Sequence, residues 1–217
     1  NSFNWSFLFG KEEVYGGSGW QVVTALELVA DLRLRPDALL PTVQVRPADP
    51  EHDLAALRTI YDRFSRTLTG PIVRNETYWQ WRVLPGRMGQ RPIYHLVELD
   101  GRPIGYFTAP QAHVREIGWI ETPAQVFAAV LSQWPDQPVH FHCFTADMVR
   151  YLRQISETPS VAAHAEHAGG LTLPLAYKGL WRYVGEGCGC FPEVTDTASL
   201  RAFLRCHEYN FWPADGF

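Results

Sequence analysis

The 217-residue sequence has few of the features that mark membrane, secreted or nucleic-acid-binding proteins. No apolar run approaches the roughly 20 residues that a membrane-spanning helix needs. The 19 Lys and Arg residues are scattered among 23 Asp and Glu residues, which leaves a net charge of −4 and no basic face for nucleic acid. Cysteine is scarce, and nothing marks secretion, so we expect reduced thiols and a cytoplasmic protein. The cysteines are Cys143, Cys188, Cys190 and Cys206.

Apolar residues are plentiful, at 46% of the chain against 19% charged residues. This composition predicts a globular protein of one large or two small domains. The first residues are already apolar, with Phe3, Trp5 and Phe7, and no methionine begins the chain. Because natural N-termini are usually polar, we expect the sequence to be the back part of a longer chain. Strands in residues 3–9 and 20–34 are too apolar to stay exposed and need partner strands.

The pattern from residue 42 onward predicts an α/β fold with a mixed sheet. Apolar residues three and four apart predict an amphipathic helix that is capped by Asp49 and begins at Pro50. The pair Asp100-Gly101 predicts a two-residue hairpin turn. Residues 35–41, "RPDALLP", read as a linker. Further elements are expected as helices at 11–15, 75–84, 122–134 and 146–155, and as strands at 42–49, 92–100, 102–110, 113–120, 138–144, 160–165 and 171–178.

Three segments of the sequence resemble a known family: "VRPADPEHDLAALRTIYDRF", "YWQWRV" and "ELDGRPIGYF". They are similar to the GCN5-related N-acetyltransferases, and to the enhanced-intracellular-survival type in which two such domains follow each other. The segment "EVYGGSGWQV", residues 13–22, resembles the F-Y-x-x-F-G-[FYW] pattern that closes the first domain, with Ser18 in place of an aromatic residue.

The resemblance implies a division of the chain into three parts. Residues 1–40 would be the C-terminal end of a first acetyltransferase domain with its linker, and 41–185 a second, degenerate domain. Residues 186–217 would be a C-terminal helix and an aromatic tail. The fold expected is therefore a mixed central sheet flanked by helices and preceded by the last strands of another such domain.

The second domain lacks the loop with which this family holds coenzyme A. That loop has the form [QR]-x-x-G-x-[GA], and its backbone N–H groups bind the pyrophosphate at a helix N-terminus. The matching segment here is "WIETPAQVF". Glu121 brings a negative charge, Pro123 removes an N–H, and no glycine is present. We therefore expect the second domain not to bind coenzyme A, and the coenzyme A loop to precede Asn1.

The resemblance implies a catalytic role for Tyr15 and for the terminal carboxylate of Phe217. The tyrosine would protonate the departing thiolate, and the carboxylate would accept a proton. The alternatives are a tyrosine that only packs at a corner and a frayed tail. The implied function is transfer of acetyl from acetyl-CoA to an amine-bearing small molecule or peptide, with this fragment alone inactive. The other hypothesis is a non-catalytic scaffold or ligand-sensing module; self-association stays open.

Two groups of residues have the composition of metal ligands. The first is His140, His142 and Cys143, of which the two histidines share one face of a strand. The second is Cys188, Cys190, Cys206 and His207, although the spacing of the first two is short for zinc. We expect no metal at either, with buried thiols and strand histidines as the alternative. The run "TYWQWR" could stack on bases, but its helical spacing favours core packing.

Overall fold

The computed structural model describes residues 5–10, 12–25, 27–68, 71–85, 91–142, 146–157, 170–172, 178–183, 196 and 198–199. The helices are α1 (Glu12–Tyr15), the 3-10 helix η1 (Gly16–Ser18), α2 (Leu54–Ser65), α3 (Glu76–Tyr78), the π-helix η2 (Trp79–Val83), α4 (Pro123–Leu131) and α5 (Ala146–Ile155). The strands are β1 (Trp5–Gly10), β2 (Gln21–Ala25), β3 (Glu27–Asp31), β4 (Val43–Pro47), β5 (Tyr94–Leu99), β6 (Arg102–Thr108), β7 (His113–Val114), β8 (Glu116–Trp119), β9 (Val139–His142), β10 (Gly170–Thr172) and β11 (Lys178–Tyr183).

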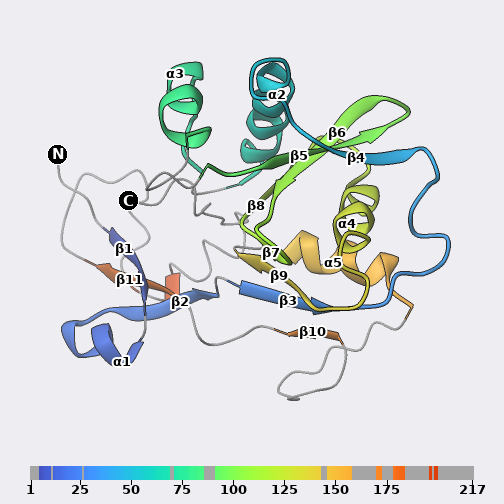
Figure 1. Ribbon diagram of the computed structural model, residues 1–217. Coiled ribbons are helices and arrows are strands. Elements are labelled where there is room, and N and C mark those ends of the chain that lie inside the picture. Colours follow the sequence, from blue (N-terminus) through green and yellow to red (C-terminus); the bar gives the residue numbers. More distant parts are fainter. Residues whose placement is uncertain are drawn as a thin grey trace.

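An antiparallel sheet of order β4-β5-β6-β8 lies at the centre of residues 43–119. The β5–β6 hairpin turns at Asp100 and Gly101, whose φ angles of 52° and 74° confirm the predicted turn. Helix α2 packs on one face of this sheet, whereas α4 and α5 lie on the other face (Figure 1). The mixed α/β fold class expected from the sequence is thus confirmed.

The strand predicted at 113–120 is in fact two short strands with different partners. Residues His113 and Val114 pair in parallel with His140 and Phe141 of β9, whereas β8 pairs antiparallel with β6. The change of partner falls at Arg115, whose N–H donates to Thr108 O at 2.8 Å. Beyond this point β8 and β9 diverge, and α4 runs between them in the chain.

The first three strands pair with strands from the far end of the chain. β1 and β2 both pair with β11, and β3 pairs with β9 and β10, all antiparallel. Strand β2 lies beside β11 in the sheet β1-β11-β2. Strand β3 lies beside β10 in the sheet β10-β3-β9-β7 (Figure 1). The partner strands that the apolar N-terminal segment requires therefore come from this chain, while the division into two domains stays a prediction.

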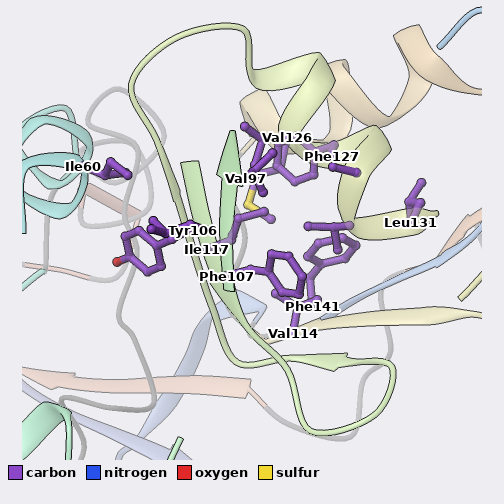
Figure 2. Packing of buried hydrophobic residues seen from close by; sticks show 14 of the residues in the cluster. Ile60, Val97, Tyr106, Phe107, Val114, Ile117, Val126, Phe127, Leu131 and Phe141 are labelled. Carbon is purple, nitrogen blue, oxygen red and sulfur yellow. The ribbon is translucent and has the colours of Figure 1, made fainter. Parts of the chain in front are cut away.

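The core lies where the central sheet meets α4, α5 and β9. Figure 2 shows Phe107, Val114, Phe127 and Phe141 converging between these elements. Each of these side chains is at most 1% exposed. Burying an aliphatic or aromatic side chain of this size stabilises the fold by about 1.5–3 kcal/mol.

Two helices begin differently from the prediction. Helix α2 starts at Leu54 and not at Pro50, because the Asp53 carboxylate accepts hydrogen bonds from Arg46 at 2.6 and 2.9 Å and from Asp49 N at 2.8 Å. Thr122 precedes α4 with φ 45° and makes no side-chain cap. The apolar face predicted for α2 is confirmed, since Leu57, Ile60, Tyr61 and Phe64 are buried. No helix in the part of the chain that the structure describes is long and apolar enough to cross a membrane.

Candidate acyl-transfer site

Tyr15 lies at a tight corner between β1 and β2. It ends helix α1 and directly precedes the 3-10 turn Gly16–Ser18. Gly19 closes the corner with φ 82°, a conformation that favours glycine, and its N–H donates to Gly16 O at 3.1 Å. The Tyr15 side chain is 38% exposed. Its hydroxyl has no hydrogen-bond partner among the residues that the structure describes.

Strand β11 holds the corner in place from the other end of the sequence. β1 and β2 do not pair with each other, because β11 lies between them. Trp5–Gly10 pair with Tyr183–Lys178 on one side, and β2 pairs with Lys178–Trp181 on the other. β1 and β2 therefore run parallel, and the connection that carries Tyr15 passes from the Lys178 end of β11 to its Trp181 end.

Several residues singled out in the sequence lie outside the described residues. Phe217 is one of them, so its proposed role stays a prediction. The candidate ligands Cys143, Cys188, Cys190, Cys206 and His207 are also outside the described ranges.

The turn before α4 is occupied by contacts within the chain. Pro123 has no N–H, and the N–H groups of Gln125 and Val126 donate to Thr122 O at 2.9 and 3.4 Å. The Gln125 side chain binds the linker, donating to Ala38 O at 3.0 Å and accepting from Leu40 N at 2.9 Å. The Glu121 carboxylate lies 3.8 Å from Arg102. This helix N-terminus thus offers few N–H groups and a nearby negative charge, which opposes phosphate binding.

Aromatic rings fill the space where β8 and β9 diverge. The ring of Phe127, from α4, lies 5.3 Å from Trp119 of β8 and 5.8 Å from Phe141 of β9, centroid to centroid. Tyr151 of α5 stacks on Phe127 at 6.2 Å. Within the part of the chain that the structure describes, these rings connect the two strands.

His140 and His142 do share one face of β9, and the structure adds a third histidine that the sequence did not suggest. The His113 ring stacks on His140 at 4.5 Å and lies 5.7 Å from His142. The parallel β7–β9 pairing brings His113 there, and nothing local in the sequence signals that pairing. Within the described ranges, no three His, Cys, Asp or Glu side chains are arranged to hold a metal ion.

The run "TYWQWR" is only partly core. Trp79 is fully buried, as predicted, but Trp81 is 75% exposed, because the π-helical turn of residues 79–83 separates the two rings. An open groove of about 620 Å³ lies beside this turn. Glu51 and Leu54 line one part of it, and Glu76 and Gln80 another.

A buried ion pair is the main feature that sequence reasoning missed. Arg74 donates to Glu116 Oε1 and Oε2 at 2.7 and 3.0 Å, and both side chains have no exposed surface. The Tyr106 hydroxyl donates to Glu116 Oε1 at 2.6 Å. Burial, and then the Glu116 charge, raise the pKa of Tyr106 well above its ordinary value. Its neutral hydroxyl therefore serves as a fixed donor and not as a proton source.

Comparison with known proteins gives a likeness in fold. No family model matches the sequence, and no curated protein does. A GCN5-related N-acetyltransferase from Anabaena variabilis ATCC 29413 is similar over 84% of this chain, with 14% identity and a TM-score of 0.52. A conserved protein from Enterococcus faecalis V583, a probable N-acyltransferase, is similar over 83% of the chain with 11% identity and a TM-score of 0.49.

This chain covers 46% and 45% of those two structures, so it spans about half their length. The structural similarity to the Anabaena variabilis protein shows a shared arrangement of strands and helices. At 14% identity it does not show a shared chemistry, which has to be argued from the site itself. The chain has the mixed α/β fold of the GCN5-related N-acetyltransferases.

Proposed function

We propose that this chain is part of an N-acetyltransferase that transfers acetyl from acetyl-CoA to an amine acceptor. Residues 1–40 would complete a first acetyltransferase domain, and 41–185 would form a second domain that does not bind coenzyme A. The coenzyme A loop would lie outside this chain, so the fragment alone would be inactive. The likeness in fold to the Anabaena variabilis protein supports a general role of this kind.

The observation that carries the proposal is the accessible Tyr15 hydroxyl at a glycine-rich corner. Attack of an amine on a thioester expels a basic thiolate, which must gain a proton while the amine loses one. A tyrosine hydroxyl suits protonation of such a leaving group. Tyr15 would donate that proton, and the Phe217 carboxylate would accept the proton from the amine.

A non-catalytic scaffold or ligand-sensing module is the second candidate. The contacts at the turn before α4 and the rings between β8 and β9 support this candidate, since neither feature favours binding of an acyl donor. Under this alternative Tyr15 only closes a corner. The two candidates differ in whether the full-length protein acetylates amines at all.

The test is acetyl-CoA-dependent acetylation of a panel of primary amines and lysine peptides by the full-length protein. Removal of the last residues should slow turnover through loss of the Phe217 carboxylate. A full-length protein without a [QR]-x-x-G-x-[GA] loop before Asn1, and without transfer to any amine, would leave the scaffold as the function.

A further inference from the structure

The residues around Arg74 have the chemistry of a binding site for a planar cation. The Arg74 guanidinium carbon lies 4.1 Å from the Tyr61 ring centroid and 5.1 Å from that of Trp79. The Glu116 carboxylate receives the guanidinium with two hydrogen bonds. Aromatic faces and a bidentate carboxylate are the two means by which proteins recognise guanidinium groups.

The walls of this site are themselves fixed. The Tyr61 hydroxyl donates to Ile72 O at 2.6 Å, and its ring meets Trp79 edge-on at 5.7 Å. Tyr94 lies 5.8 Å from Trp79 and 5.7 Å from Tyr106. Figure 2 shows Tyr106 and Phe107 on opposite faces of the sheet. The cage of Tyr61, Trp79, Tyr94, Tyr106 and Glu116 is thus built on α2, η2 and the central sheet.

Arg74 enters this cage from a surface loop. Residues 71–75 directly precede α3 and have no regular structure, and Val73, next to Arg74, is 91% exposed. Asn75 then caps α3 by accepting from Tyr78 N at 2.8 Å. The Arg74 side chain is fully buried although its neighbour Val73 is exposed, so a segment at the surface places the guanidinium in the cage.

We propose that the cage is a guanidinium-binding site that the chain fills with its own Arg74. Its occupant ties the 71–75 loop to Glu116, next to Arg115, where the strand changes partner from β9 to β6. The site is selective for a planar cation, because Glu116 needs two parallel donors and the rings need a flat charged group. While Arg74 is in place, the site is closed to free amines and guanidines.

Chemical rescue of Arg74→Ala tests this directly. The variant should lose about 6–20 °C in melting temperature, the loss expected when a buried pair is broken in a domain of this size. Guanidinium chloride below about 50 mM is too dilute to denature. A concentration ten times its dissociation constant should restore about 3–6 °C, saturably. The wild-type chain should show no such gain.

Matched controls separate binding from general effects. Urea has the same planar shape without charge, and sodium chloride supplies only ionic strength, so neither should rescue. Arg58→Ala removes an arginine whose ion pair with Glu76 is exposed, and guanidinium should not stabilise that variant. Adding Glu116→Gln to Arg74→Ala should abolish the rescue. Equal stabilisation of Arg58→Ala, rescue by urea, or rescue without Glu116 would overturn the proposal.

The proposal remains testable if Arg74→Ala does not fold unaided. Refolding by dilution should then recover folded protein with 20 mM guanidinium but not with 20 mM urea or sodium chloride. Arg74→Lys keeps the charge on one side chain but lacks the planar fork, so it should melt below the wild type. An Arg74→Lys variant as stable as the wild type would contradict a guanidinium site. So would a refolding yield that is the same with and without guanidinium. Neither outcome depends on acetyl transfer, so this inference and the proposed function fail separately.

Discussion

The turns at 15–19 and 120–123 each place a residue in the left-handed conformation, and their surroundings differ. At 15–19 the residue is Gly19, with φ 82°, and the neighbouring Tyr15 is 38% exposed. At 120–123 it is Thr122, with φ 45°, followed by Pro123 and bound through Gln125 to the linker. The first turn presents a proton donor to solvent, and the second is closed by contacts within the chain.

The two turns differ in how well they suit the binding of a phosphate. A helix N-terminus binds phosphate only when its N–H groups are free and no negative charge is near. The turn before α4 offers few such N–H groups and carries Glu121. The Tyr15 corner is small and depends on β11, yet it is the turn whose polar group is accessible.

Removal of the Tyr15 hydroxyl should have the largest effect. In the full-length protein, Tyr15→Phe should lower kcat at least tenfold, since general acid catalysis typically contributes about 10²- to 10⁴-fold. The dissociation constant for acetyl-CoA should change little, because the ring remains. Steady-state kinetics with direct binding would measure both, with Val14→Ala, an exposed neighbour, as control. An unchanged kcat would make the corner structural.

Loss of Glu116 should sharply destabilise the domain that contains the closed turn. Glu116→Ala leaves Arg74 as a buried charge without its carboxylate, which should cost about 3–5 kcal/mol of unfolding free energy. Glu76→Ala breaks the exposed pair with Arg58 and should cost less than about 1 kcal/mol. Urea denaturation measures both losses. Similar losses in the two variants would mean that the buried pair does not hold the domain together.

Asp53 should make the stability of the same domain modestly dependent on pH in the acidic range. The hydrogen bonds from Arg46 lower the pKa of Asp53 from its ordinary 3.8. Its stabilisation is therefore fully present above that value and is lost as the pH falls through the lower folded value. Asp53→Asn should cost about 1 kcal/mol at pH 7. The difference from the wild type should shrink below about pH 4. A difference that stays constant to pH 2 would exclude this linkage.

Substitution of Gly19 and of Thr122 should change the stability of the fold least, and in opposite directions. Gly19→Ala should destabilise by about 1 kcal/mol, because alanine disfavours φ 82°. Thr122→Gly should stabilise by about 0.5 kcal/mol, since relief of strain exceeds the entropy cost of glycine. It should not create acetyl-CoA binding, because Glu121 and Pro123 remain. Thermal unfolding of both variants checks the signs; destabilisation by Thr122→Gly would show no strain at that turn.

The sequence predicted local features well because their causes are local. The spacing of Leu57, Ile60, Tyr61 and Phe64 predicted the buried face of α2, and Asp100-Gly101 predicted the hairpin turn. The expectation that residues 120–123 do not bind coenzyme A also rests on residue chemistry alone, and it stays a prediction. In each case the residues that decide the structure are neighbours in the chain.

What the sequence could not predict depends on distant pairing. Arg74 and Glu116 are 42 residues apart, and the β7–β9 pairing that brings His113 to His140 leaves no local pattern. The change of strand partner at Arg115 was not predicted, because the sequence of residues 113–120 is typical of one continuous strand. Pairing of β1 and β2 with β11 spans most of the chain, so only tertiary structure could supply their partners.

Titration of the 217-residue chain with acetyl-CoA tests the central claim most directly. Residues 1–31 should be kept, because β3 pairs with β9. Isothermal calorimetry should show no binding, since the turn before α4 offers few N–H groups and carries Glu121. Micromolar binding that is lost in Ala124→Pro, which removes a further N–H from this helix N-terminus, would contradict the account.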